Sequence, residues 1–296
     1  MTTTKNRAPK PEWLKAQIPS GENYFRIKKN LESRNLSTIC QRAKCPNISE
    51  CWNNYHATFL IMGDTCSRNC SFCSVNSGHP QALLKEEAER VLEMVDILKA
   101  TYVVITSVTR DDLEDGGSTH FAGVIRHLKS HRPELKIEVL IPDFKGNIED
   151  IDRVLAAQPH VLNHNMETVK RLYPYVNRRI ENYDRSLQVL KHSHQQGFVT
   201  KSGIMVGLGE TVAELHELFG DLRESGVKLL TIGQYLQPTK ENVPVEKFYT
   251  PAEFVDLKNL ALSCGFIAVE SGAFVRSSYQ AQGMYELVGK GLQHSL

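Results

Sequence analysis

Six of the seven cysteines lie between Cys40 and Cys73, and their spacing suits metal chemistry. They form two groups of three, the first spaced C-x4-C-x5-C and the second spaced C-x3-C-x2-C. The first cysteine group is Cys40, Cys45 and Cys51, and the second cysteine group is Cys66, Cys70 and Cys73. Thiolates bind soft metal centres, so three of them this close together predict a metal site.

The second cysteine group could hold either of two centres. On a 4Fe–4S cubane, three thiolates leave one iron free to bind a small molecule. A structural zinc ion would need a fourth ligand, which His79 could supply. Apart from that, the histidines show no spacing typical of a metal site.

The first cysteine group precedes the first predicted strand and does not have zinc-finger spacing. Its three thiols suffice for a second cluster with an incomplete cysteine set. The alternative is a loop with three buried thiols, because a free cysteine is often simply buried. Cys264, the seventh cysteine, closes an apolar helix and is expected in the core.

Composition narrows the class of protein. The chain has 296 residues, of which 41% are hydrophobic and 23% charged, so it can build a core and is not disordered. A net charge of +1 argues against a non-specific nucleic-acid binder. No apolar run is long enough to span a membrane, and residues 1–19 lack the apolar centre of a secretory signal. A cytoplasmic location is expected, where clustered cysteines more often bind metal than form disulfides.

Strand-like and helical segments alternate after residue 57. The predicted strands are 57–62, 102–106, 137–141, 161–163, 204–206 and 229–232. The predicted helices are 84–99, 120–130, 147–157, 184–195, 211–224 and 251–263. This alternation predicts βαβ units and a parallel α/β sheet. It favours an incomplete TIM-type (β/α)6 barrel with N-terminal and C-terminal extensions, with a doubly wound open sheet as the alternative.

In either architecture, ligands gather at the carboxyl ends of the strands. The second cysteine group follows the first predicted strand, which places it on that face. Residues 57–264 are expected to form the barrel. Residues 1–56 are expected to carry the first cysteine group as an extension, and residues 265–296 to form a second extension.

Longer motifs carry a resemblance to a known family. They are residues 43–47, 63–73, 107–117, 163–168, 201–210, 233–238 and 276–279. With the two cysteine spacings, they resemble the lipoyl synthase family of radical S-adenosylmethionine (SAM) enzymes, from about residue 20 to residue 285. Residues 241–245 and 271–275 depart from the family pattern, and neither segment contains an expected cluster ligand.

The resemblance implies two 4Fe–4S clusters and SAM as cofactors. The second cysteine group would hold the cluster whose open iron binds the amino and carboxylate groups of SAM. An electron from that cluster would cleave SAM to a 5′-deoxyadenosyl radical that abstracts hydrogen. The first cysteine group would hold an auxiliary cluster that donates sulfur, with Ser278 as its fourth ligand. Without the resemblance, Ser278 reads as an ordinary N-cap residue.

Several residues near the ends of the predicted strands are expected to surround SAM. Some lie in an acidic segment, for which the alternative is a solvated loop. Lys201 opens a glycine-rich segment, for which the alternative is a tight turn between strand and helix. The expected cofactor-binding residues are Phe72, Thr109, Arg110, Asp111, Asn163, Asn165, Glu167, Arg185 and Lys201.

The implied reaction inserts two sulfur atoms at C6 and C8 of an octanoyl chain on a lysine of a lipoyl carrier domain. Implied carriers are the E2 subunits of 2-oxoacid dehydrogenases and the glycine cleavage H protein. A low-potential electron donor (flavodoxin or ferredoxin) and an Fe–S carrier protein are further implied partners, with no nucleic acid and no membrane. The alternatives are another radical SAM sulfur-inserting enzyme, a non-catalytic Fe–S electron carrier, or a zinc-stabilised interaction module.

Overall fold

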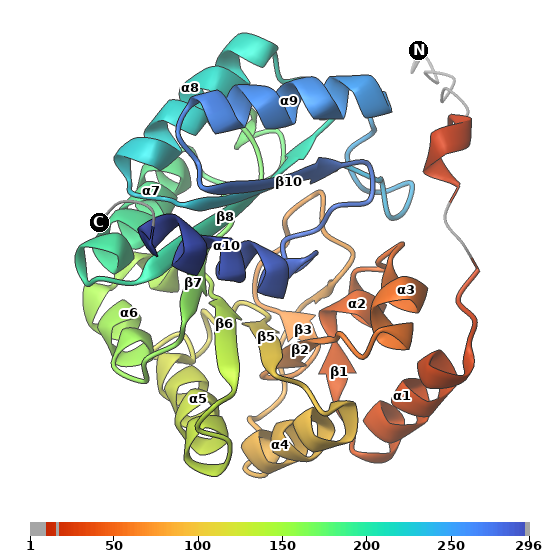
Figure 1. Cartoon of the computed structure of the whole chain (residues 1–296), viewed down its shortest axis with the longest axis vertical. Helices are drawn as coiled ribbons and strands as arrows, with labels where there is room; N and C mark the ends of the chain where they lie inside the picture. The colour runs from red at the N-terminus through yellow and green to blue at the C-terminus, as the bar shows by residue number, and fades with distance from the viewer. Residues whose placement is uncertain (1–9, 16–17, 294–296) are drawn as a thin grey trace.

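The computed structural model describes residues 10–15 and 18–293 (Figure 1). Most of the expected polar N-terminal tail, residues 1–9 and 16–17, lies outside the described residues, as do residues 294–296. The strands are β1 (Ser37–Thr38), β2 (Thr58–Ile61), β3 (Thr65–Cys66), β4 (Asn76–Ser77), β5 (Tyr102–Ser107), β6 (Lys136–Leu140), β7 (Val161–Asn163), β8 (Val199–Val206), β9 (Leu229–Gln234) and β10 (Ala268–Gly272).

Helices surround the strands (Figure 1). The α-helices are α1 (Glu22–Ser33), α2 (Ile39–Arg42), α3 (Ile48–Asn53), α4 (Glu87–Leu98), α5 (Ser118–His131), α6 (Ile148–Leu155), α7 (Glu181–Gln195), α8 (Val212–Glu224), α9 (Pro251–Ser263) and α10 (Ala281–Gln293). The 3-10 helices are η1 (Glu12–Leu14), η2 (Phe144–Gly146) and η3 (Lys170–Leu172).

The main sheet follows chain order, β1-β2-β5-β6-β7-β8-β9-β10. Only β1 pairs antiparallel; from β2 to β10 each neighbouring pair is parallel, with Thr58 of β2 opposite Val104 of β5. A doubly wound sheet would reverse its order at a switch point, so that alternative is wrong. Within the described residues the sheet ends at β1 and β10 without closing, which confirms the partial barrel.

The two-residue strands β1, β3 and β4 were not predicted, and two longer strands of the main sheet also differ from the sequence prediction. The strand β10 adds a seventh parallel strand after the six βα units. The sequence did not indicate this strand because its segment is short and partly polar. The strand β8 begins at Val199 rather than Ile204. Its first half contains Thr200, Lys201 and Ser202, which are all fully buried. Because these residues are polar, the sequence did not indicate a buried strand there.

The core lies between the sheet and the outer helices. One apolar cluster joins β2, β5 and β6 to α4, α5 and α6, and a second joins β8 and β9 to α7, α8 and α9. Helix α10 lies over the amino ends of the strands (Figure 1), where Ala281 packs against Tyr102 and Met284 against Val161. The barrel is therefore covered at that end, and its carboxyl end is left for a ligand.

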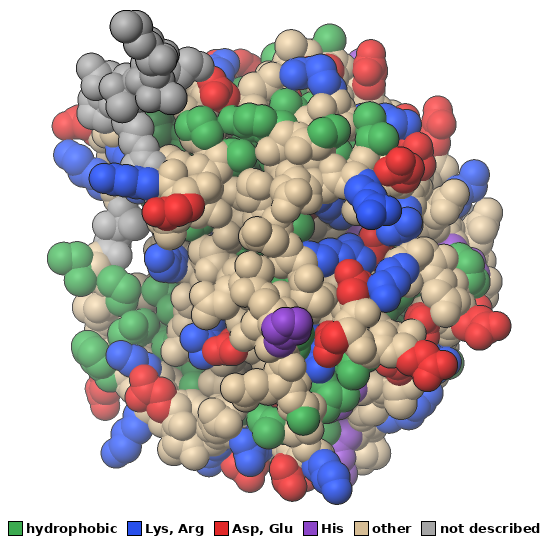
Figure 2. Space-filling view, turned by 180° about the vertical axis from the view of Figure 1, so that it is seen from behind, with side chains coloured by type: hydrophobic (Ala, Val, Ile, Leu, Met, Phe, Trp, Pro, Cys, Tyr) green, Lys and Arg blue, Asp and Glu red, His purple; other side chains and the backbone are tan. Residues whose placement is uncertain are grey.

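Charged side chains of both signs are interspersed over the face seen in Figure 2. No helix among the described residues is both long and apolar enough to cross a membrane. Cys264 packs against the second apolar cluster, as the sequence predicts.

Candidate functional site

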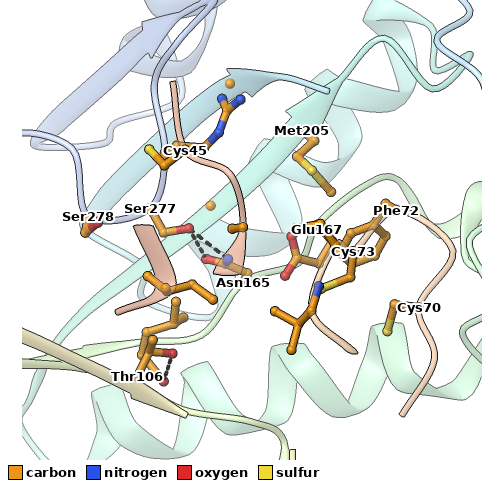
Figure 3. A pocket seen from close by; sticks show the side chains of 18 of the residues that line it. Cys45, Cys70, Phe72, Cys73, Thr106, Asn165, Glu167, Met205, Ser277 and Ser278 are labelled. Carbon is orange, nitrogen blue, oxygen red and sulfur yellow. Dashed lines mark hydrogen bonds between the residues drawn. The ribbon is translucent and has the colours of Figure 1, made fainter. Parts of the chain in front are cut away.

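A large cavity lies inside the barrel, toward the carboxyl ends of the strands (Figure 3). This barrel cavity has a volume of about 600 Å³, within the range of small-molecule sites. Its wall includes the whole second cysteine group together with Cys40 and Cys45 of the first. Two groups that are separate in the sequence thus face one space.

A smaller cavity, the outer cavity, has a volume of about 300 Å³ and lies at the amino ends of β2 and β5. Its wall is formed by α3, the start of α10 and the segment between β10 and α10, and it includes the whole first cysteine group. The two cavities share a wall whose residues are Cys40, Cys45, Thr58, Val104, Arg276 and Ser278.

The second cysteine group sits on a loop whose backbone already donates hydrogen bonds to sulfur. Cys66 Sγ accepts from the backbone N–H groups of Thr109 at 3.3 Å and Arg68 at 3.4 Å. Cys73 Sγ accepts from the N–H of Val75 at 3.4 Å. Such bonds stabilise thiolates, as they do around iron–sulfur clusters.

Side chains from distant elements hold this loop in place. The amide of Asn242 donates to the carbonyls of Ser71 at 3.1 Å and Cys73 at 3.0 Å. The Ser71 N–H donates to the carbonyl of Val176 at 3.0 Å. These hydrogen bonds hold the ligand loop in place, and Asn242 is a positioning residue that the motif did not reveal.

The first cysteine group is held between the helices α2 and α3. A capping box of Thr38 and Gln41 starts α2, so Cys40 points from a fixed helical turn. The Asn47 amide donates to the Phe274 carbonyl at 2.6 Å and ties this segment to the chain just before Arg276. Segments 227 residues apart in the sequence thus meet here.

Burial raises the pKa of most of the cysteine thiols. It takes the pKa of Cys40 and Cys70 to about 11 and that of Cys51 to about 12. The pKa of Cys73 is also raised to about 12, and that of Cys45 is raised as well. Thiols that are neutral at pH 7 must release protons when they ligate iron.

The donor set fits clusters better than single ions. Within the described residues, no three His, Cys, Asp or Glu side chains are gathered closely enough to hold one ion. A cubane spaces its ligands over several irons, which suits thiols spread around a cavity wall. The exposed His79 does not line the barrel cavity, so the zinc alternative lacks its fourth ligand.

Buried polar atoms without hydrogen-bond partners on the cavity wall indicate that a polar ligand binds in the barrel. Ser107 Oγ and Asn163 Oδ1 line the barrel cavity and are buried without a hydrogen-bond partner, as expected where a polar ligand binds. The Trp52 indole N–H is also buried without a partner of hydrogen-bonding geometry. It lies beside Cys40 and slightly offsets the rise of that thiol's pKa.

Glu167, on the cavity wall, has a strained backbone conformation. Its φ of +69° is a left-handed conformation that glutamate rarely adopts. A bridge to β8 enforces it, because the Met205 N–H donates to the Glu167 carbonyl at 2.7 Å. Strain of this kind is typical of functional sites. Burial raises the pKa of Glu167, and the nearby Arg178 opposes that rise.

The two neighbouring serines have different partners. The Asn165 amide donates to Ser277 Oγ at 2.8 Å, inside the barrel cavity (Figure 3). Ser278 Oγ instead accepts from the Thr58 hydroxyl at 2.8 Å, on the wall shared by the cavities. Gly203 makes room for the first contact, since a Cβ there would lie 2.8 Å from Asn165 Oδ1 and 3.0 Å from Ser277 Oγ.

Five of the residues predicted to surround SAM line the barrel cavity. They are Phe72, Thr109, Asn163, Asn165 and Glu167. Phe72, on the ligand loop itself, packs against the second apolar cluster, and the Thr109 backbone N–H donates to Cys66 Sγ.

The other four predicted residues do not line either cavity. Arg110 is buried against Asp112, and Asp111 pairs with Arg68, with Nε to Oδ2 at 2.6 Å. Arg185 reaches Asp143 at 3.4 Å. These pairs brace the loops beneath the cavity.

Lys201 lies deepest of the four, in a polar network inside the barrel. Its ammonium and the Glu138 carboxylate are both 0% exposed and 2.9 Å apart. Glu138 also accepts from Tyr102 OH at 2.7 Å and from the Asn163 amide at 3.2 Å. The expected SAM contact is therefore placed as half of a buried ion pair.

Arg68, Arg178 and Arg276 lie on the cavity wall and were not among the predicted cofactor-binding residues. Arg178 lies over the ring of Tyr173, with its guanidinium carbon 4.8 Å from the ring centroid. Arg276 lies on the shared wall, close enough to lower the pKa of Cys45 against the effect of burial. Arg178 stands in no local pattern that singles it out, and Arg276 opens the 276–279 motif, which did not indicate this role.

Two family models match the sequence. Residues 60–222 match the radical SAM superfamily. Residues 1–45 match the N-terminal domain of lipoyl synthase of the radical SAM family. The first match spans β2 to α8, and the second ends at Cys45 of the first cysteine group.

Solved structures show the same fold at low sequence identity. Methylornithine synthase superposes with a TM-score of 0.52 at 16% identity, over 72% of this chain and 70% of that one. The FeFe-hydrogenase maturase HydG from Carboxydothermus hydrogenoformans superposes with a TM-score of 0.52 at 12% identity, over 90% and 78%.

Close relatives cover almost the whole chain. A lipoyl synthase of Rubrobacter xylanophilus is 48% identical over 97% of this chain and 90% of its own length. One from Myxococcus xanthus is 49% identical, over 96% and 95%, and one from Bacteroides fragilis is 50% identical, over 93% and 96%. With its partial barrel and its two cysteine groups, this chain belongs to the lipoyl synthase family of the radical SAM superfamily.

Proposed function

We propose that the barrel cavity is where this radical SAM sulfurtransferase inserts two sulfur atoms into a protein-bound octanoyl chain. As a member of its family, the enzyme uses SAM and two 4Fe–4S clusters. The observation that carries the proposal is that both cysteine groups face one cavity. A sulfur donor and the site of SAM cleavage can then act on the same substrate carbon chain.

The three thiols of the second cysteine group are the proposed ligands of the SAM-binding cluster. When bound, that cluster supplies the electron that cleaves SAM. The chain itself contributes a ligand loop with three N–H···S bonds, which favour the thiolate forms. Glu167, Asn165 and Arg178 face the same space with a carboxylate, an amide and a guanidinium, and are the proposed partners of the polar groups of SAM.

The first cysteine group and Ser278 are the proposed ligands of the sulfur-donating cluster. They come from the two extensions, which the Asn47 and Thr58 hydrogen bonds bring together. An oxygen ligand is a poorer match for iron–sulfur chemistry than a fourth thiolate. Such a site suits a cluster that must give up sulfur. The division into residues 1–56, 57–264 and 265–296 remains a prediction.

The cavity also offers apolar surface for an octanoyl chain. Leu14, Leu60, Val108 and Ile204 line it between the polar groups. Abstraction from an unactivated carbon needs a dry site, since water would add competing reactions. The proposed protein substrates are octanoylated lipoyl carrier domains. The proposed further partners are a flavodoxin or ferredoxin and an Fe–S carrier protein, and the proposed location is the cytoplasm.

The test is anaerobic reconstitution followed by reaction with an octanoyl-lysyl peptide, SAM and dithionite. We expect about eight irons and eight sulfides per chain, as two cubanes require, and a lipoyl product with 5′-deoxyadenosine. Zinc without iron, or SAM cleavage without any sulfur insertion, would contradict the proposal.

Cysteine variants test the division of roles. Cys66→Ala, Cys70→Ala and Cys73→Ala should each abolish 5′-deoxyadenosine formation, because three ligands leave no redundancy. Cys40→Ala, Cys45→Ala and Cys51→Ala should still cleave SAM but form no lipoyl product. Full sulfur insertion by a folded variant of the second kind would refute the division.

A further inference from the structure

The first cysteine group can be reached from two sides. Cys40, Cys45 and Ser278 line both the barrel cavity and the outer cavity. Cys51 lines the outer cavity and is not on the wall of the barrel cavity. A cluster held by these ligands would therefore form part of the partition between the two spaces.

The outer cavity opens to the surface on the side away from the second cysteine group. It lies at the amino ends of β2 and β5, whereas the second cysteine group follows the carboxyl end of β2. Several residues of its wall are exposed, among them Glu50, Asn54, His56, Gln280 and Gly283. Solutes can thus approach Cys51 without passing through the barrel.

The proposed chemistry makes such a second approach useful. A cluster that gives sulfur to the product must be replaced before the next turnover. Whenever SAM or an octanoyl chain occupies the barrel cavity, access to these ligands from that side would be blocked. The outer cavity leaves the opposite face of the same ligands accessible.

We infer that the outer cavity is the path by which iron, ferrous and ferric in equal amounts, and sulfide reach the first cysteine group to rebuild its cluster. The inference rests on the proposed function, since it assumes that this cluster is consumed. Polar groups on the outer wall, the Glu50 carboxylate and the His56 imidazole, suit the passage of ions better than an apolar surface.

Helix α10 offers a way to close this path without touching a ligand. Gly283 lies on the wall of the outer cavity, is exposed, and has no atom within 4 Å of the position of an added Cβ. Gly289, two turns farther along the same helix, is also exposed with nothing within 4 Å, and lies outside both cavities. Gly283→Trp and Gly289→Trp therefore form a matched pair.

The first measurement is independent of activity. The full-length chain, prepared without clusters, is labelled anaerobically with N-ethylmaleimide, and labelling of each cysteine is followed by mass spectrometry. We expect Gly283→Trp to slow labelling of Cys51 about tenfold, because the reagent could then reach Cys51 only when the structure around the outer cavity opens locally. Gly289→Trp should label Cys51 at the wild-type rate, and Cys70 and Cys73 should be unaffected in both variants.

The second measurement follows cluster loading with sulfide and equal amounts of ferrous and ferric iron. In a background with Cys66, Cys70 and Cys73 changed to alanine, Gly283→Trp should slow iron uptake, and Gly289→Trp should not. In the converse background, with Cys40, Cys45 and Cys51 changed to alanine, both variants should load at the unmodified rate. If Gly283→Trp does not fold, Gly283→Leu takes its place.

Equal Cys51 labelling in the Gly283 and Gly289 variants would overturn the inference, as would equal iron uptake. Neither result would touch the proposed function, which is decided by formation of the lipoyl product. Conversely, the wild-type chain could form no lipoyl product while Cys51 labelling still differs between the Gly283 and Gly289 variants. The access path would then stand, and its role in rebuilding the cluster would be refuted.

Discussion

The hydroxyl of Thr58 donates a hydrogen bond to Ser278 Oγ over 2.8 Å, joining residues 220 positions apart. Thr58 begins β2, directly before the second cysteine group, and is 5% exposed. The bond holds the serine oxygen at the wall shared by both cavities. A serine that served only as a helix cap would have no need of this contact with the barrel.

The first prediction concerns the two serines. Ser278→Ala should leave the first cluster short of a ligand, so iron per chain falls and the lipoyl product is lost. Ser278→Cys should assemble a firmer cluster that gives up sulfur slowly, because a full thiolate set binds iron better. Iron content and single-turnover product yield are measured for both variants.

Ser277→Ala is the matched control, because it loses a bond to Asn165 and leaves the Thr58–Ser278 contact intact. It should keep the first cluster. If Ser278→Ala gives a normal product yield and loses only about 0.5–2 kcal/mol of stability, the serine is a cap.

The second prediction separates two arginines. Arg178 lines the barrel cavity, and its removal in Arg178→Met should weaken SAM binding about tenfold to a hundredfold, the value of a charge-assisted hydrogen bond. Arg185→Met should change SAM affinity little, because Arg68 still pairs with Asp143 at 2.6 Å. Anaerobic calorimetry of SAM binding measures both, and the reverse order of effects would restore Arg185 as the contact.

The two cysteine groups could be recognised from the sequence because their spacing is typical of iron–sulfur ligands, and their role as cluster ligands stays a prediction. Cys66, Cys70 and Cys73 lie on one short loop, so their proximity is visible in the sequence itself. The barrel followed from the alternation of strands and helices. The strand β10 escaped because Glu270 and Ser271 interrupt an already short apolar run.

The residues that line the barrel cavity were harder to predict because this depends on how far along the barrel axis each residue lies. Lys201 and Gly203 belong to the same strand, yet one is enclosed in the barrel and the other lines the cavity. Position along the barrel axis decides between them, and no local pattern encodes it. Arg178 reaches the cavity from a turn between η3 and α7, which the sequence does not mark.

The third prediction tests the placement of Lys201. Lys201→Met leaves the Glu138 carboxylate buried without its cation, which should cost about 3–5 kcal/mol of unfolding free energy. The double variant Lys201→Met/Glu138→Leu should recover much of that loss, since no buried charge remains. Urea unfolding of the cluster-free protein measures the stability. Weaker SAM binding in a Lys201→Met variant of normal stability would instead make the lysine a SAM contact.

The last prediction concerns the pH dependence of stability. His164 is 4% exposed, and burial lowers its pKa from 6.5 to about 4. Its Nδ1–H donates to the Ile141 carbonyl at 2.8 Å, and Nε2 accepts from the Ser186 hydroxyl at 2.9 Å, so the neutral ring is fully bonded. Asp143 opposes the lowering, and Arg178 and Arg68 add to it.

Because the folded pKa lies below the unfolded value, the unfolded chain binds the extra proton between pH 6.5 and pH 4. The contribution of His164 is therefore complete above pH 6.5 and is lost as the pH falls toward 4. At about 1.4 kcal/mol per pH unit, about 2 kcal/mol of it is lost between pH 7.5 and pH 5.

Urea unfolding of the cluster-free protein at pH 7.5 and pH 5 measures this loss, and His164→Gln should reduce the difference between the two pH values. Ser186→Ala is the control, because it removes a partner of the ring but keeps the titrating group. It should lower stability at both pH values and preserve the difference. An unchanged pH dependence in His164→Gln would show that other groups account for the loss of stability in acid.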